Sequence, residues 1–262
     1  FVNLFDKFFL VRYTKTEYGA VKMLGFFSLF IFLLVYLFTD VIDLSLPGVY
    51  IPILSGVFEI SYIYFYLRAI KNDDVGFAAA LFSFTPIFIL LMSYFLLGAG
   101  LKIVPVFGTF IITFGILLLY FSREKSLKNI HHNKTISVMI IATFISALSS
   151  LLLDKSLESF SVFQTLFISR GGVFLGTLII LPLIRKQKQA GTSWPFIISE
   201  VSYLIVMYFF IITLSRGNVV YVSGVVNTQL LFVFAFSWLL SKYLPFMLKE
   251  KFIFHNKILA VI

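Results

Sequence analysis

Hydrophobic runs long enough to cross a lipid bilayer follow one another along almost the whole chain. A transmembrane helix needs roughly 20 mostly apolar residues, and the first and last runs look clipped by the ends of the chain. Backbone polar groups must be satisfied inside hydrocarbon, so such runs form helices. The sequence therefore predicts an all-α, polytopic membrane protein with ten transmembrane helices. The predicted spans are Phe1–Val11, Tyr18–Phe38, Val49–Ala69, Asp74–Leu97, Leu101–Phe121, Lys134–Leu157, Phe160–Ile184, Trp194–Leu214, Gly217–Leu240 and Phe252–Ile262.

Composition agrees with this fold class and excludes several others. Hydrophobic residues make up 60% of the 262 residues and charged residues 13%, and the mean hydropathy is +1.01. A water-soluble domain of this length cannot bury so much apolar surface. Cysteine is absent, which excludes disulfides and thiolate metal sites. The net charge of +9 comes from basic residues between the apolar runs, so it indicates membrane topology rather than a nucleic-acid partner.

Motifs in the first half of the chain recur in the second half at a nearly constant separation. At 148 residues, Asp6-Lys7 recurs as Asp154-Lys155 and Lys22 as Arg170. At 141 residues, Glu59-Ile60-Ser61-Tyr62 recurs as Glu200-Val201-Ser202-Tyr203. At 144 residues, Val75, Phe77, Ala80 and Phe88 correspond to Val219, Tyr221, Gly224 and Phe232. The recurrence predicts a duplicated membrane unit.

The duplicated unit contains five spans, which fixes the relation between the two copies. Residues 1–121 form the first unit, 122–133 a basic connecting loop and 134–262 the second unit. An odd number of spans inverts the second unit, giving a pseudo-two-fold axis in the membrane plane. Thirteen Lys and Arg residues fall in connections on one side and two on the other. Since positive residues mark the cytoplasmic face, the amino terminus is expected outside.

Two stretches of this two-by-five repeat carry a family resemblance. The first contains Leu67-Arg68-Ala69-Ile70, Pro86 and Phe107-Gly108, and the second contains Ser237-Trp238-Leu239-Leu240. In these stretches the sequence resembles the EamA-like branch of the drug/metabolite transporter superfamily. The resemblance implies secondary transport of small metabolites, with a site between the two halves at mid-depth. Members of that family commonly place the amino terminus in the cytoplasm, unlike the orientation that the charges indicate here.

Glu59 is the strongest single candidate for a functional residue. It lies in the middle of its predicted span, where a charged carboxylate costs about 2.5–3.5 kcal/mol on insertion scales. It should therefore face the protein interior or water. Its functional interpretation is a proton carrier or a counter-ion for a cationic substrate, and the alternative is a hydrogen-bonded packing residue. Glu200 is the residue of the second unit that corresponds to Glu59, and we call such corresponding residues repeat mates. It lies near the start of a span, where a solvated interfacial role is equally expected.

Other polar side chains within spans are candidates to line a substrate site. Tyr62 shares a helical stripe with Glu59, and an aromatic ring beside a carboxylate can hold a cation, although Tyr also anchors spans at the interface. Pro86 can kink its helix and free a carbonyl. Asn227 is costly in lipid unless it bonds a neighbouring helix or a ligand. The predicted substrate-binding residues are Glu59, Tyr62, Ser83, Thr85, Asn227 and Gln229.

The repeated charges also predict structural ion pairs. Adjacent residues on a helix point in different directions, so Asp6 and Lys7 cannot pair well with each other. We expect instead that Asp6 pairs with Lys22 and Asp154 with Arg170, each pair joining the first two spans of its own half.

These patterns favour a carrier over other classes of membrane protein. The leading hypothesis is a multi-pass secondary transporter, importer or exporter, in the plasma membrane. It would move a small polar or cationic metabolite by alternating access. Coupling to protons and assembly into a homodimer are both compatible with the sequence. Alternatives are a flippase of lipids or lipid-linked sugars and a membrane-embedded enzyme. His131 and His132 lack further metal ligands, and no catalytic cluster or cofactor motif is visible, so we expect no enzyme activity and no cofactor.

Overall fold

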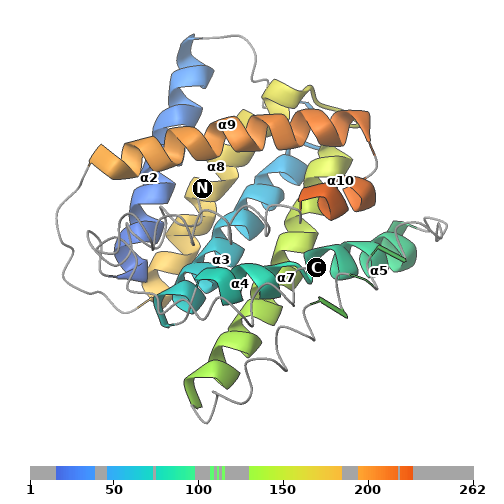
Figure 1. Ribbon diagram of the computed structural model, residues 1–262. Coiled ribbons are helices and arrows are strands. Elements are labelled where there is room, and N and C mark those ends of the chain that lie inside the picture. Colours follow the sequence, from blue (N-terminus) through green and yellow to red (C-terminus); the bar gives the residue numbers. More distant parts are fainter. Residues whose placement is uncertain are drawn as a thin grey trace.

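The regular structure of the described part of the chain is helical (Figure 1). A computed structural model describes residues 16–38, 46–72, 75–97, 107–108, 111, 114–115, 130–184, 194–217 and 219–226. The predicted all-α class is confirmed for these ranges. In chain order the elements are α2 (Glu17–Phe38), α3 (Tyr50–Asn72), α4 (Val75–Phe82), α5 (Thr85–Leu97), α7 (Ile130–Ser156), α8 (Val162–Ile180), the 3₁₀ turn η2 (Leu181–Leu183), α9 (Trp194–Arg216) and α10 (Val219–Val226).

Five of the described helices are long and apolar enough to cross a membrane. They coincide with five predicted spans, whose existence is therefore confirmed. The first and last predicted spans, most of Leu101–Phe121 and the end of Gly217–Leu240 lie outside the described residues. The total of ten spans and the inverted arrangement accordingly stay predictions. The five helices are Glu17–Phe38, Tyr50–Lys71, Lys134–Ser156, Val162–Leu183 and Ile197–Arg216.

The predicted span Asp74–Leu97 is wrong as a single helix. It is divided into α4 and α5 by a turn at Ser83 and Phe84. Pro86 has no N–H to donate to the carbonyl of Phe82 four residues earlier, and its ring disfavours a continuous helix. Thr85 supplies the missing donor, because its Oγ1 lies 2.7 Å from the Phe82 carbonyl oxygen. The break is therefore accommodated locally, without a free carbonyl at Phe82.

Two local signals set the start of helices. Before α3, Pro47 and Gly48 form a turn in which the Val49 N–H donates to the Leu46 carbonyl at 3.4 Å. Gly48 has φ +89°, the left-handed value that the third residue of a type II turn requires. Before α8, Ser161 and Gln164 form a capping box, each side chain accepting from the other residue's N–H at 3.3 and 2.9 Å.

α3 is the central helix of the described part. It packs most extensively against α7 and α8, and α2 packs against α8 (Figure 1). One buried cluster gathers around α3 and a second around α9 and α10, and both receive residues from α7 and α8. Many large apolar side chains face outward, among them Leu37 at 69% and Phe38 at 81% exposure, as expected for surfaces in contact with lipid.

Glycines allow the backbones of α3 and α8 to approach closely. A Cβ on Gly56 would overlap the carbonyl oxygen of Ser169, and a Cβ on Gly172 would overlap that of Ile53. Small residues serve this purpose in membranes, where packing rather than the hydrophobic effect drives helix association. The contact lies one turn from Glu59 on α3 and beside residue 170 on α8. It therefore sets how closely the charged side chains of these helices meet.

The glycine contact predicts a specific instability. Gly56→Ala should lower the free energy of unfolding by about 1–3 kcal/mol, because overpacking forces the two backbones apart. Thermal unfolding in detergent measures the change. Gly224→Ala is the matched control, since a Cβ there meets no atom of the described residues within 4 Å. Equal melting temperatures for the two variants would contradict the close approach of α3 and α8.

Candidate functional site

A fully buried ion pair joins α3 to α8. The Nη2 atom of Arg170 lies 2.7 Å from Oε1 and 2.5 Å from Oε2 of Glu59. The two side chains are 2% and 0% exposed. The prediction that Glu59 faces the interior rather than lipid is therefore confirmed. Charges buried at such depth are stable only when they are paired and hydrogen-bonded, so the two helices are held in one register by this contact.

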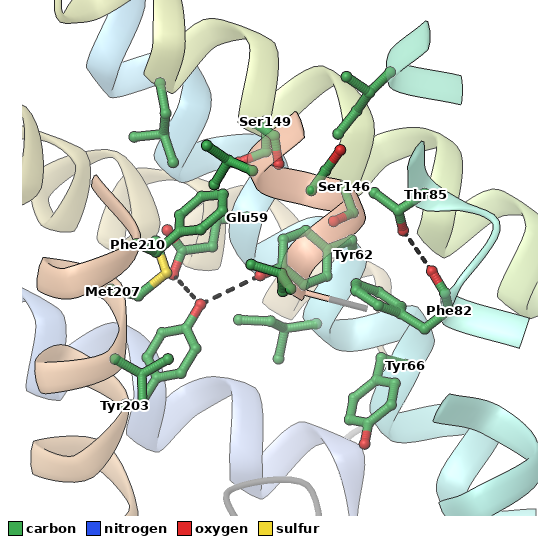
Figure 2. A pocket seen from close by; sticks show the side chains of 18 of the residues that line it. Glu59, Tyr62, Tyr66, Phe82, Thr85, Ser146, Ser149, Tyr203, Met207 and Phe210 are labelled. Carbon is green, nitrogen blue, oxygen red and sulfur yellow. Dashed lines mark hydrogen bonds between the residues drawn. The ribbon is translucent and has the colours of Figure 1, made fainter. Parts of the chain in front are cut away.

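Tyr203 connects the ion pair to α9. Its hydroxyl donates to Oε1 of Glu59 at 2.9 Å, and it lies 3.2 Å from the hydroxyl of Tyr62 (Figure 2). The guanidinium carbon of Arg170 lies 5.8 Å from the centre of the Tyr203 ring, within the range of a cation–π contact. Glu59 thus receives donors from α8 and α9, and three helices meet at its carboxylate.

Two pairs of repeat mates touch each other. Tyr62 and Tyr203, 141 residues apart, contact through their hydroxyls. Phe26 and Phe174, 148 residues apart, contact edge to face with ring centres 5.9 Å apart. When a two-fold axis relates two copies, a residue that contacts its own mate lies beside that axis. The two contacts are what the predicted pseudo-two-fold axis would produce.

A cavity of about 570 Å³ opens beside the ion pair. Its volume is in the range of roughly 300–1,000 Å³ typical of small-molecule sites. Its walls come from both halves of the chain: α2, α3, α4 and α5 in the first, and α7, α9 and α10 in the second. Apolar side chains such as Phe82, Met207 and Phe210 form much of the wall, with serines and tyrosines between them (Figure 2).

Glu200 lines the same cavity. It is 6% exposed and lies close enough to Arg170 for an electrostatic interaction, so the solvated interfacial alternative for Glu200 does not hold. Depth along a span does not determine burial, because neighbouring helices cover this part of α9. The repeat mates Glu59 and Glu200 therefore share one chamber. When all three are ionised, Glu59, Glu200 and Arg170 together carry one net negative charge.

The remaining predicted site residues differ in their position relative to the cavity. Ser83 is buried and donates to the Ala79 carbonyl at 3.4 Å, within its own helix turn, and does not line the cavity. Thr85 does line the cavity, although its hydroxyl is bonded to the Phe82 carbonyl. Asn227 and Gln229 lie outside the described residues.

The predicted pair of Asp154 with Arg170 is wrong. Asp154 lies close to the end of α7, whereas Arg170 lies eight residues into α8. A helix rises about 1.5 Å per residue, so Arg170 starts about 12 Å from the near end of α8 and Asp154 about 3 Å from that of α7, depths roughly 9 Å apart. Arg170 instead reaches across to Glu59. The predicted partner of Lys22, Asp6, lies outside the described residues, and Lys22 is half-buried with no ion pair within the described ranges.

Sequence reasoning missed several lining residues, including Ser146, Ser149, Met207 and Phe210. None of these carries a charge or a motif that stands out in apolar sequence. The repeat pattern predicted a pair of Arg170 with Asp154 of its own half, and the partner Glu59 in the other half was not found. One signal could have found it: the Glu-x-x-Tyr motif occurs in both halves, and in an inverted repeat both copies can face the same central space.

The ion pair predicts strong coupling between its members. Breaking a buried pair by removing one partner costs about 3–5 kcal/mol, whereas removing both costs much less. Arg170→Met and Glu59→Met should each lower the unfolding temperature in detergent, and the double variant should recover part of the loss. Lys155→Met with Glu158→Met is the matched control, because that pair is 50% and 63% exposed and should show little coupling. Additive losses at Glu59 and Arg170 would contradict the pairing.

Known proteins resemble this chain in part of its sequence and in its fold. No curated protein matches the chain. A solved structure described as "Crystal structure of protein" superposes with a TM-score of 0.54 at 14% identity, covering 92% of this chain and 93% of that one, which shows a shared fold alone. The sequence model of the EamA-like transporter family matches residues 4–121. As the resemblance predicted, this part of the chain is similar to the EamA-like transporter family.

Proposed function

We propose that this protein is a secondary transporter of a small cationic metabolite, working by alternating access around the cavity between its two halves. The observation that carries the proposal is the chamber lined by Glu59 and Glu200 and walled by helices of both predicted repeats, with Arg170 paired to Glu59. In inverted-repeat carriers the substrate lies at the interface of the repeats, and rocking of one repeat against the other exposes it to alternate sides.

The charge of the chamber favours a cation. Arg170 offsets one of the two carboxylates, which leaves one negative charge among these three groups. A buried carboxylate is stabilised by a positively charged partner. We therefore propose that a proton and the substrate cation bind beside these carboxylates in alternation, each displacing the other. Competition of this kind would couple export of the cation to entry of a proton.

The wall of the cavity favours an organic cation with an apolar body. Tyr62, Tyr66 and Tyr203 line the cavity, and the Tyr203 hydroxyl contacts the Glu59 carboxylate. Aromatic rings attract cations through their quadrupole. Phe82, Met207 and Phe210 offer contacts for an apolar group (Figure 2). A nucleotide sugar, with several negative charges and many hydroxyls, would find fewer partners here.

A flippase of lipids or lipid-linked sugars is the second candidate, and one observation favours it. Three lining residues, Val206, Phe209 and Val225, are 53%, 61% and 68% exposed. They form an apolar border where the cavity meets the surface of α9 and α10. A molecule with an acyl chain could use such a border, whereas a small amine would not need it.

A ligand screen followed by flux measurements tests the two candidates. Thermal unfolding of the purified protein is measured with monovalent organic amines, with nucleotide sugars and with short-chain lipids. A specific ligand at 100 times its dissociation constant stabilises by about 2.7 kcal/mol. We expect amines alone to stabilise the protein and to cross proteoliposome membranes when a pH gradient is imposed. Stabilisation and transbilayer movement of lipid alone would support the flippase.

The coupling role of Glu59 makes a further prediction. Glu59→Gln should reduce proton-driven amine flux in proteoliposomes by at least tenfold, because the carboxamide neither binds a proton nor balances Arg170. Tyr203→Phe, which removes only the hydroxyl that donates to Glu59, should reduce flux less and keep the fold. Flux unaffected by Glu59→Gln would remove Glu59 from the mechanism while leaving the carrier itself in place.

A further inference from the structure

The repeat gives the buried ion pair an equivalent elsewhere in the chain. The offset of 141 relates Glu59 to Glu200, and the offset of 148 relates Arg170 to Lys22. Both members of the Glu59–Arg170 pair therefore have mates of the same charge. The equivalent pair would join Lys22 on α2 to Glu200 on α9.

Only one of these two equivalent pairs is formed. α3 packs along α8, but α2 and α9 are not among the extensively packed helix pairs of the described part. Lys22 is half-buried and makes no ion pair within the ranges that the structure describes. The Nε atom of Arg170 is buried without a hydrogen-bond acceptor, so this arginine is not fully satisfied by Glu59. The described conformation thus departs from two-fold symmetry at its charged centre.

We propose that Lys22 and Glu200 form the second ion pair of the transport cycle, made in the opposite-facing conformation when Arg170 releases Glu59. The inference rests on the proposed carrier function and its inverted repeats. In such a protein, each half adopts in one state the conformation that the other half has in the opposite state. Exchange of the two halves therefore turns the Glu59–Arg170 contact into the Glu200–Lys22 contact.

The exchange has an energetic basis in the residues involved. Each state would hold one buried ion pair, so neither leaves all its charges uncompensated. Arginine binds a carboxylate through a rigid planar fork, whereas lysine offers a single flexible ammonium group. The state with the Arg170 pair should therefore be favoured in the absence of substrate. This agrees with its being the conformation described here.

The contacts between repeat mates are suited to act as the pivot. A contact across a two-fold axis maps onto itself when the halves exchange conformations. The Tyr62–Tyr203 and Phe26–Phe174 contacts can therefore persist in both states, while the two ion pairs alternate. The alternative is that Lys22 only extends its ammonium group toward the membrane surface, in which case it never meets Glu200.

Cysteine cross-linking tests the proposal directly, because the chain contains no cysteine of its own. Two double variants are compared in proteoliposomes, Glu59→Cys with Arg170→Cys and Lys22→Cys with Glu200→Cys. A reversible bifunctional thiol reagent as long as an extended Arg–Glu pair is added to both. We expect both pairs to cross-link, since trapping accumulates even a minor state.

The outcomes separate this inference from the proposed function. Cross-linking at positions 59 and 170 alone, or at neither pair, overturns the alternation of ion pairs. Amine flux by the unmodified protein tests the carrier function independently, and its presence would preserve that function in either case.

A second measurement uses the matched single variants Lys22→Gln and Arg170→Gln. The cavity residue Ser146 is replaced by cysteine in each, and its labelling by a membrane-impermeant thiol reagent is compared from the two sides. Loss of Lys22 should favour the described state and loss of Arg170 the opposite one. The ratio of labelling rates should therefore shift at least threefold in opposite directions. If Arg170→Gln fails to fold, an unchanged ratio in Lys22→Gln still overturns the proposal.

Discussion

The ion pair between Glu59 and Arg170 is the interaction on which the rest of the described structure depends. Two full charges at mid-helix are stable in a bilayer only if they meet each other and exclude lipid. They meet because Gly56 and Gly172 let the backbones of α3 and α8 approach. Tyr203 adds a donor from α9. The pair therefore fixes the relative register of three helices and places an aromatic wall beside a carboxylate.

The same geometry links packing to motion. A buried ion pair holds helices together, but it is also a discrete contact that is either made or broken. Its donors come from α8 and α9, whereas Glu59 belongs to α3, so movement between the halves must change its surroundings. The break between α4 and α5 adds a second discontinuity at the wall of the cavity, where Thr85 satisfies the carbonyl that Pro86 leaves open. Rigid helices joined at such points can rock without losing their internal hydrogen bonds.

Much of the fold could be predicted from the sequence, because few backbone structures are stable in a bilayer. The spans containing α2, α3, α7, α8 and α9 follow from apolar length alone. The burial of Glu59 follows from the cost of a charge in lipid. The partner of Arg170 could not be predicted in this way. The pattern of apolar residues within one half does not determine at which depth its side chains lie relative to those of the other half. The break before Thr85 was missed because Pro86 permits either a kink or a full interruption, and only the local donor decides between them.

The most direct measurement is infrared difference spectroscopy of the protein in lipid, comparing the native chain with Glu59→Gln. If Glu59 is an ionised partner of Arg170, the variant should lose carboxylate stretching bands and leave the carbonyl band of protonated carboxylic acids unchanged. Loss of a protonated carboxylic acid band instead would show that Glu59 is neutral in the resting protein. In that case an ion pair would not be the feature that organises the site.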